Sequence, residues 1–466
     1  MRTNLRLAAY AGMVLGAVVL FLLVRHYGEA LVAPARVQTV APAGGGDGAA
    51  SNALMQLLLA LAAVVVVGRL LGRCLARVGQ PPVIGEVLGG IMLGPSLLGR
   101  VAPAVSAAIL PPAVAPFLGV VAQLGIILYM FLIGLDLDGA LLRRRAHAIV
   151  MTSHASIVVP FVLGSFLALF LYPRLSTSDV PFTSFALFMG VAMSITAFPV
   201  LARILTDRGI SRTELGVVAL TCAAADDVTA WCLLAFVVGV VHATMEGALA
   251  VAIMTVCFIG VMFVLVRPMV GWLIARSETG SADRRPTTEA IAATLACVLL
   301  SALATERIGV HAIFGAFLFG AMIPHDSGLA RALIEKLQDV VTILLLPAFF
   351  AFTGMRTEVG LISGWAGWLM CGLIIVVATA GKFGGTLAAA RLTGMGWRQA
   401  ASLGILMNTR GLMELIVLNI GFELGVISPT LFTMMVLMAL ATTMATTPAL
   451  KLAAPQLSLR DRAASV

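Results

Sequence analysis

Long apolar runs separated by short polar joints occupy almost the whole chain. A typical run, LMQLLLALAAVVVVG at residues 54–68, lacks the alternation of apolar and polar residues that a membrane β-barrel strand requires. A helix needs about 20 apolar residues to cross a bilayer, and the chain offers run after run of that length. The pattern therefore predicts an all-α polytopic membrane protein.

Fourteen helices are predicted from the apolar runs and the joints between them. They lie at residues 7–24, 53–73, 83–99, 117–135, 147–172, 182–204, 214–240, 247–275, 289–305, 309–325, 339–355, 362–390, 399–421 and 430–450.

The first helix stands apart from the other thirteen, because a Gly/Pro/Ala-rich stretch at residues 33–52 separates it from them. We divide the chain into an N-terminal helix with its linker (1–52), a membrane domain (53–450) and a short tail (451–466) in which no further domain is expected. Two interpretations of the first helix are open, a cleaved signal and a retained span. Its length favours the retained span.

Composition agrees with a membrane protein. Of 466 residues, 60% are hydrophobic and 11% are charged, which lies far outside the range of soluble domains. The six cysteines are scattered and form neither a CxxC pair nor a Cys/His cluster. We therefore expect no disulfide framework, no zinc, haem or iron–sulfur site, and no cofactor.

The basic residues alternate between rich and poor joints, which supports the helix count. Twenty of them fall on one side and only four fall on the other, namely Arg100, Arg174, Arg307 and Arg356. The rich side holds Arg69, Arg73, Arg77, Arg143, Arg144, Arg145, Arg203, Arg208, Arg212, Arg267, Arg276, Arg284, Arg285, Arg331, Lys336, Arg391, Arg398, Lys451, Arg460 and Arg462. We expect the rich side and the C-terminus to be cytoplasmic, and the net charge of +8 to set topology rather than to bind nucleic acid.

Two neighbouring carboxylates lie in the middle of an apolar helix. Asp226 and Asp227 follow about twelve residues of the run that starts at Glu214, with no basic residue nearby in sequence. Each ionisable group at that depth costs roughly 2.5 to 3.5 kcal/mol, so it requires a partner or a function. Adjacent helical residues point about 100° apart, so the two side chains are expected to have different roles. A structural ion pair is the alternative.

Lys382 is the expected counter-charge for this pair. An unpaired ammonium at that depth would lose its proton or its place in the helix. Gly381, Gly384 and Gly385 allow a second helix to approach closely enough for a carboxylate–lysine pair. A purely structural pair is again the alternative.

Polar residues and helix breakers interrupt two further apolar stretches at comparable depth. Interrupted helices in the two halves of a transporter indicate a midplane site, where half-helix ends and freed carbonyls meet an ion. Arg410 and Glu414, four residues apart, are equally consistent with a simple intrahelical pair. The polar residues and breakers of these two stretches are Ser194, Thr196 and Pro199 in the first, and Asn408, Thr409, Arg410 and Glu414 in the second. Outside both stretches, His311 is interpreted as a structural histidine near the membrane interface.

Several segments, in order, resemble the monovalent cation:proton antiporter-2 family, with its Kef-type and plant cation/H+ exchanger branches nearest. They include PPVIGEVLGGIMLGPSLLG, LGIILYMFLIGLDLD, SITAFPVLARIL, the Asp226/Asp227 pair, LPAFFAFTGMRTEV, GKFGGT and MNTRGLMELIVLNIG. The resemblance covers residues 53–450.

This resemblance implies an inverted-repeat antiporter fold of thirteen core helices, with a core domain and a dimerisation domain in a homodimer. Two discontinuous helices, 182–204 and 399–421, would cross beside the carboxylate helix. Asp227 would bind cation and proton in turn, Asp226 would pair with Lys382, and Thr196 would lie near the ion. The expected location is the bacterial inner membrane.

The expected function is exchange of Na+ or K+ for H+ without ATP, and not enzyme catalysis. Many Kef-type and plant members of the family carry Asn or Gln at the position of Asp226, whereas the Asp-Asp form resembles the electrogenic sodium branch. The lack of a cytosolic domain argues against glutathione-gated potassium efflux. Na+ and K+ are both retained as candidate substrates. Rival interpretations are a sodium-coupled organic-anion symporter, a cation channel and an intramembrane enzyme.

Overall fold

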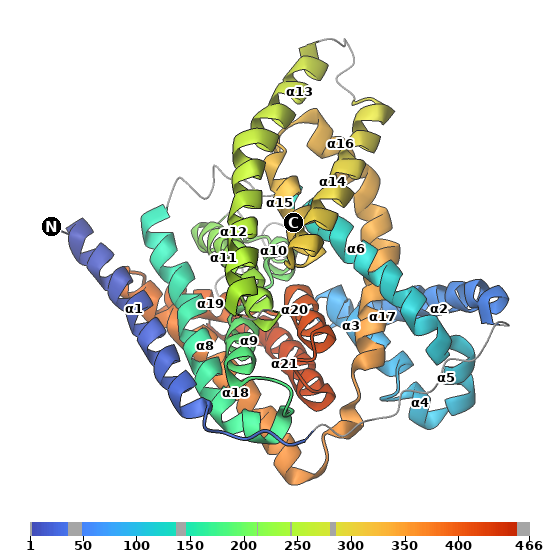
Figure 1. Ribbon diagram of the computed structural model, residues 1–466, viewed down its shortest axis with the longest axis horizontal. Helices are drawn as coiled ribbons and strands as arrows, with labels where there is room; N and C mark the ends of the chain where they lie inside the picture. Colours follow the sequence, from blue (N-terminus) through green and yellow to red (C-terminus); the bar gives the residue numbers. More distant parts are fainter. Residues whose placement is uncertain are drawn as a thin grey trace.

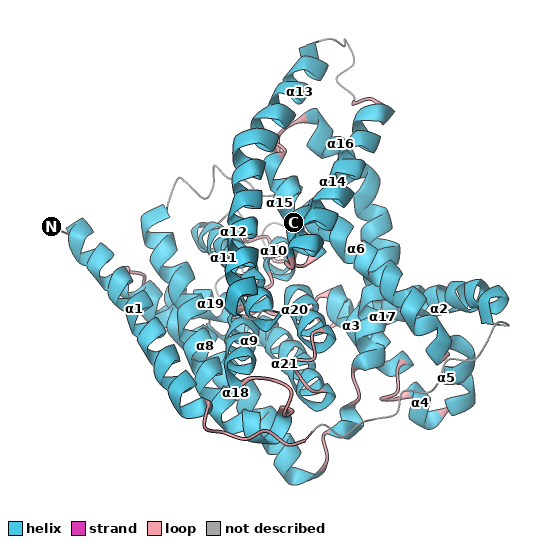
Figure 2. Ribbon diagram, in the orientation of Figure 1, coloured by secondary structure: helices cyan, strands magenta, loops and turns pink. Residues whose placement is uncertain are grey.

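The computed structural model describes residues 2–35, 49–136, 146–211, 213–242, 245–279 and 286–453. Throughout these ranges the regular structure is helical, and no strand occurs in them (Figure 2). The all-α fold expected from the apolar runs is therefore confirmed.

Helices of very different lengths make up the chain (Figure 1). In the first half they are α1 (Arg2–Gly28), α2 (Ala49–Arg77), α3 (Pro82–Leu93), α4 (Leu98–Val101), α5 (Pro103–Ile109), η1 (Pro112–Val114), α6 (Ala115–Leu135), α8 (Ala146–Leu175), α9 (Phe182–Ser194), α10 (Phe198–Asp207) and α11 (Glu214–His242). In the second half they are α12 (Met245–Val261), η2 (Met262–Val266), α13 (Arg267–Thr279), α14 (Thr288–Ile308), α15 (Ala312–Met322), α16 (Gly328–Val340), η3 (Val341–Leu345), α17 (Leu346–Arg356), η4 (Val359–Leu361), α18 (Gly364–Leu392), α19 (Trp397–Met407), α20 (Leu412–Glu423) and α21 (Pro429–Ala453).

The described residues contain 12 helices long and apolar enough to cross a membrane, or 13 if the bent pair α19 and α20 counts as one span. The short apolar helix α15 corresponds to the remaining predicted run, so every one of the predicted stretches is helical. The prediction for one segment between two helices was wrong. The charged segment before residue 339 was expected to be a loop, but it forms α16 and continues through η3 into α17. Its apolar residues Ala330 and Leu333 are buried, which explains why the helix extends there.

Two sets of helices recur along the chain with the same pairings. In what we term the scaffold group, α2 packs on α3 and α14 packs on α15, while α3 contacts α17 and α15 contacts α6. In the core group, α8 packs on α9 and α11, and α18 packs correspondingly on α19 and α21, while α20 packs on α21 and α9. The central contact of the core group is between α8 and α18 themselves. This repeated pattern is that of an inverted-repeat fold.

Glycines let the scaffold helices touch backbone to backbone. A Cβ added to Gly354 of α17 would lie 2.0 Å from the carbonyl carbon of Gly90 in α3. The corresponding contact in the other repeat joins Gly134 of α6 to α15, where an added Cβ would lie 2.3 Å from the carbonyl oxygen of Phe317. Small residues permit such close packing where lipid supplies no hydrophobic driving force. The scaffold group is thus held by contacts that allow no larger side chain.

The extra helix α1 packs against the core group rather than against α2, the next helix in sequence. In Figure 1 it lies along α8 at one end of the molecule, while α2 lies at the other end. Val24 is buried there, and the Phe21 and Phe161 rings are 5.9 Å apart. The backbone N–H of Ser178 donates to the carbonyl oxygen of Pro34 at 2.9 Å. The segment after α1 is thus also bound to the core group.

We expect Gly354→Ala to lower the thermal stability of the detergent-solubilised protein, because the new methyl group overlaps the backbone of α3. Overpacking of this kind costs about 1–3 kcal/mol. The matched control is Gly372→Ala on α18, where an added Cβ meets no atom within 4 Å. Thermal unfolding should show a lower midpoint for the first variant and an unchanged or slightly higher one for the control. Equal midpoints would contradict the proposed packing.

Candidate ion-exchange site

The two interrupted helices meet at their breaks. The first break, Ile195–Ala197, separates α9 from α10, and the second, Asn408–Gly411, separates α19 from α20 with a bend of 43°. The backbone N–H of Ala197 donates to the carbonyl oxygen of Thr409 at 2.9 Å, so the unwound segments pair directly. The crossing expected from the sequence is present.

Glycine and proline shape these breaks in ways that the sequence only partly indicated. Gly411 has φ +148°, a conformation that side chains disfavour, and an added Cβ would lie 3.1 Å from Val200 Cγ2. Pro199 was expected to act as a helix breaker within its apolar stretch. Instead it lies in the first turn of α10, where an N–H has no helical partner to lose.

Two buried cations cap the carboxyl end of α9. Arg410 donates from Nη1 to the Ala192 carbonyl oxygen at 3.1 Å and from Nη2 to the Met193 carbonyl oxygen at 2.7 Å. Lys382 Nζ donates to the next carbonyl oxygen, that of Ser194, at 2.5 Å. Positive charge at a helix C-terminus is favourable, since the last carbonyls lack helical partners and carry a partial negative charge. A half-helix can therefore end in the protein interior.

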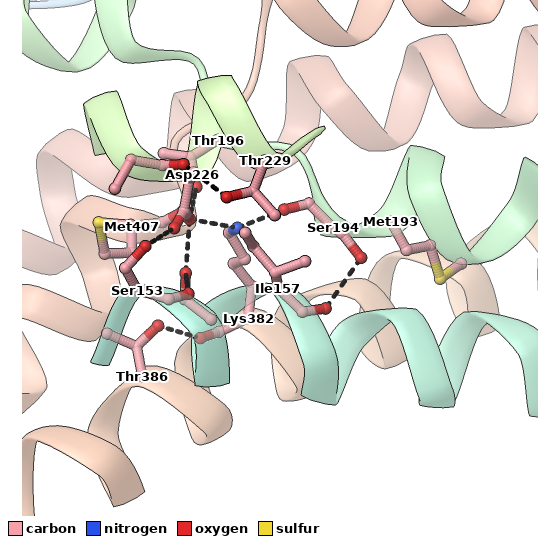
Figure 3. Close-up of polar contacts among 12 residues, drawn as sticks. Ser153, Ile157, Met193, Ser194, Thr196, Asp226, Thr229, Lys382, Thr386 and Met407 are labelled. Atoms are coloured by element: carbon pink, nitrogen blue, oxygen red, sulfur yellow. Dashed lines mark hydrogen bonds and ion pairs between the residues drawn. The ribbon is translucent and has the colours of Figure 1, made fainter. Parts of the chain in front are cut away.

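Asp226 is fully buried and accepts four side-chain hydrogen bonds (Figure 3). Its donors come from two other helices and from the break after α9. They are Lys382 Nζ at 3.1 Å, Ser153 Oγ at 2.7 Å, Ser156 Oγ at 2.5 Å and Thr196 Oγ1 at 3.0 Å. This carboxylate is thus saturated by donors from α8, α18 and the crossing.

Asp227 has entirely different surroundings. It is 3% exposed, and neither carboxylate oxygen has a hydrogen-bond partner among the described residues. Tyr129 of α6, in the scaffold group, is close enough to interact with it electrostatically. The 100° step between adjacent helical residues has separated the two carboxylates as the sequence predicted.

The other predicted site residues serve the crossing. The Ser194 hydroxyl donates to the carbonyl oxygens of Gly190 and Ile157, at 2.7 and 2.9 Å, so only its backbone carbonyl contacts Lys382. Glu414 Oε2 accepts from Arg410 Nη1 at 3.1 Å, and Thr409 Oγ1 lies 3.4 Å from Thr446 Oγ1. Asn408 is buried, with its Oδ1 unpaired among the described residues.

Sequence reasoning missed Ser153 and Ser156. They lie three residues apart in α8, and both hydroxyls point at Asp226. Two serines on one face of an otherwise apolar helix were a usable signal, because hydroxyl groups in a span need partners. Their importance depends on the contact between α8 and α11, which is not apparent from the chain order.

Comparison with known proteins identifies the family. Residues 59–452 match the family described as "Sodium/hydrogen exchanger, transmembrane". This chain belongs to that family. The exchanger-family protein is 43% identical over 400 residues to the Na+/H+ antiporter NhaS4 of Synechocystis sp., covering 85% of this chain and 97% of that relative. The resemblance to cation:proton antiporters is thereby confirmed.

Longer eukaryotic relatives match as well. Cation/H+ antiporter 20 of Arabidopsis thaliana is 42% identical over 415 residues, covering 86% of this chain and 49% of the relative. K+/H+ antiporter 1 of Saccharomyces cerevisiae is 33% identical over 422 residues, covering 88% and 48%. The exchanger-family chain therefore spans about half the length of these relatives.

A solved structure shares the fold. The sodium proton antiporter MjNhaP1 from Methanocaldococcus jannaschii at pH 8 superimposes with a TM-score of 0.65 at 14% identity, covering 87% of this chain and 99% of that one. At this identity the likeness concerns the arrangement of helices alone.

We predict that Lys382→Met will destabilise the protein by about 3–5 kcal/mol, because it leaves Asp226 as an uncompensated buried charge. Adding Asp226→Asn in the same chain should recover much of the loss, since the amide carries no charge. Thermal unfolding of the wild type, both single variants and the double variant gives the coupling free energy between Lys382 and Asp226. A double variant no more stable than Lys382→Met would contradict the assigned pair.

Proposed function

We propose that this protein exchanges a monovalent cation, Na+ or K+, for H+ at Asp227. The observation that carries the proposal is a buried carboxylate whose two oxygens lack protein donors. Burying an uncompensated carboxylate is costly, so such a group must hold either a proton or a cation. Asp226 is already stabilised by four hydrogen-bond donors, so it requires neither a proton nor a bound cation.

The two occupants of Asp227 exclude each other. Release of a cation leaves a carboxylate that a proton neutralises, and loss of that proton admits the next cation. If the site opens to one side of the membrane at a time, this competition couples the two flows without ATP. Carboxylate, hydroxyl and carbonyl oxygens are also the ligands that a hard monovalent cation prefers.

The balance of charges explains why the site should not move across the membrane when it holds neither a proton nor a cation. Lys382 pairs with Asp226, and Arg410 pairs with Glu414, so Asp227 is the remaining charge of the site. Loaded with a proton, or with a cation while Lys382 keeps its proton, the site is neutral. Empty, it carries a net negative charge that is unfavourable within the bilayer. Movement of the unloaded site across the membrane would uncouple the two ion flows, and its net negative charge disfavours that movement.

Electrogenic exchange requires a second proton per cation, and the Asp226–Lys382 pair is its proposed source. A cation that also engages Asp226 would release the ammonium of Lys382, which could then lose its proton. The Asp-Asp sequence supports this proposal.

The relatives named above are antiporters, which favours exchange over organic-anion symport. NhaS4 is named for Na+ and the yeast relative for K+, so both cations belong in the proposal. We propose further that the C-terminus is cytoplasmic, that the protein lies in a bacterial inner membrane, and that it forms a homodimer through the scaffold group. The packing of α1 on α8 supports its retention as part of the protein.

Asp227→Asn should abolish exchange, because a neutral amide neither binds a proton nor balances a cation. The assay is cation-induced dequenching of a pH-sensitive dye in inverted membrane vesicles. Asp227→Glu is the matched control, as it keeps the charge and should retain partial activity. Substantial exchange by the asparagine variant would rule out Asp227 as the exchanging group.

We expect purified protein in liposomes to drive proton movement with Na+ or K+, and an imposed membrane potential to change the rate. The measurement scans Na+, K+ and Li+ with and without a potential-clamping ionophore that does not itself carry the tested cation. Cation flux that proceeds unchanged without proton movement would indicate a channel. Exchange insensitive to potential would exclude the electrogenic proposal while preserving the antiporter.

A further inference from the structure

A polar cluster joins the scaffold group to the core group far from the ion-exchange site. Arg356, the last residue of α17, donates from Nη1 to Glu423 Oε1 at 2.9 Å and to Asn419 Oδ1 at 3.0 Å. Both acceptors lie on α20. Asn419 Nδ2 in turn donates to Thr353 Oγ1 of α17 at 2.8 Å. The two helices are therefore tied by three hydrogen bonds at one level.

Aromatic rings hold the guanidinium of Arg356 in place. It lies 3.9 Å from the ring centre of Phe352 in its own helix and 5.3 Å from that of Phe422 in α20. Such cation–π contacts add to the ion pair and favour one orientation of the arginine. We call Arg356, Asn419 and Glu423 the latch.

The latch lies at the opposite end of α20 from the crossing. Helix α20 starts beside the crossing at Leu412, and at 1.5 Å per residue its last residue, Glu423, is about 16 Å further along the axis. Arg356 is one of the four basic residues on the side of the membrane that is poor in basic residues. Under the proposed topology, the end of α20 that carries Glu423 therefore faces the extracytoplasmic side.

Cavities lie on both sides of the latch. A small one of about 20 Å³ is lined by Asn419 and Glu423 together with His311 and Ile416, and it extends between α6, α15, α17 and α20. A larger one of about 700 Å³ is lined by Arg356 and Phe352. Phe352 lines both cavities, Arg356 borders the larger one, and its partners Asn419 and Glu423 border the smaller one.

We propose that the latch is the extracytoplasmic gate of this exchanger, closed in the present structure, and that it must open before Asp227 can meet that side. The inference rests on the proposed function. An ion pair that links two groups of helices blocks their separation while it is formed. Once Arg356 withdraws, Glu423 and Asn419 are left as polar groups lining the opened route.

The first test measures access to the small cavity. Ile416, which is 1% exposed, is replaced by Cys in a chain whose six native cysteines have been removed. A membrane-impermeant thiol reagent is then added to intact cells. Arg356→Gln should raise the labelling rate about fivefold, the change expected for loss of roughly 1 kcal/mol of latch energy. The swap Arg356→Glu with Glu423→Arg should restore slow labelling.

The matched control is Arg100→Gln, which removes another basic residue on the same side of the membrane, packed on Gly360 rather than on α20. It should leave labelling unchanged. An unchanged rate in Arg356→Gln, or an equal rise in Arg100→Gln, would overturn the gate. Asp227→Asn should abolish exchange without altering labelling, so failure of the exchange mechanism and failure of the gate give different results.

A second test locks the gate. In the same background, Arg356→Cys with Glu423→Cys is joined by a short thiol crosslinker that a reductant can cleave. Exchange should stop on crosslinking and return on reduction. The control pair, Ser96→Cys with Val359→Cys, lies within the scaffold group, where the Val359 N–H donates to Ser96 Oγ at 3.1 Å. Full exchange in the crosslinked Arg356/Glu423 pair, or equal inhibition in the control pair, would overturn the proposal.

Discussion

The ammonium of Lys382 connects parts of the protein that are far apart in sequence. It binds the carboxylate of Asp226 on α11 and the terminal carbonyl of α9, while its own helix, α18, packs against α8. Without this charge, a half-helix would end unsatisfied in the interior and a carboxylate would be buried alone. The interrupted helices, the crossing and the free carboxylate next door all require it.

The same arrangement gives the two neighbouring aspartates different surroundings. Asp226 accepts from the ammonium of Lys382 and from three hydroxyl groups, whereas neither oxygen of Asp227 has a hydrogen-bond partner among the described residues. Tyr129 of α6, in the scaffold group, is close enough to Asp227 to interact with it electrostatically. A carboxylate in a fixed charge network thus lies next to one without a hydrogen-bond partner among the described residues, and the difference arises from the geometry of a single helical step.

Much of this could be predicted from the sequence, because bilayer insertion is a strong constraint. The length of the apolar runs fixed the helices, and the cost of buried charge indicated Asp226, Asp227 and Lys382. Contacts between distant helices could not be predicted in this way. Ser153 and Ser156 are ordinary polar residues until α8 meets α11, and Arg356 was noted only as one of four basic residues on its side. Pro199 was recognised, but its role changed because the break precedes it.

The position of α1 has a consequence for the order of assembly in the membrane. Its partner is α8, which begins at residue 146, whereas α1 ends at residue 28. At about 5–20 residues per second, roughly 6 to 24 s pass between the end of α1 and the start of α8. During that time it must be stable with lipid on every side, which its continuous helix and apolar surface allow. Helix α1 therefore meets its partner only after α2, α3 and α6 have been synthesised.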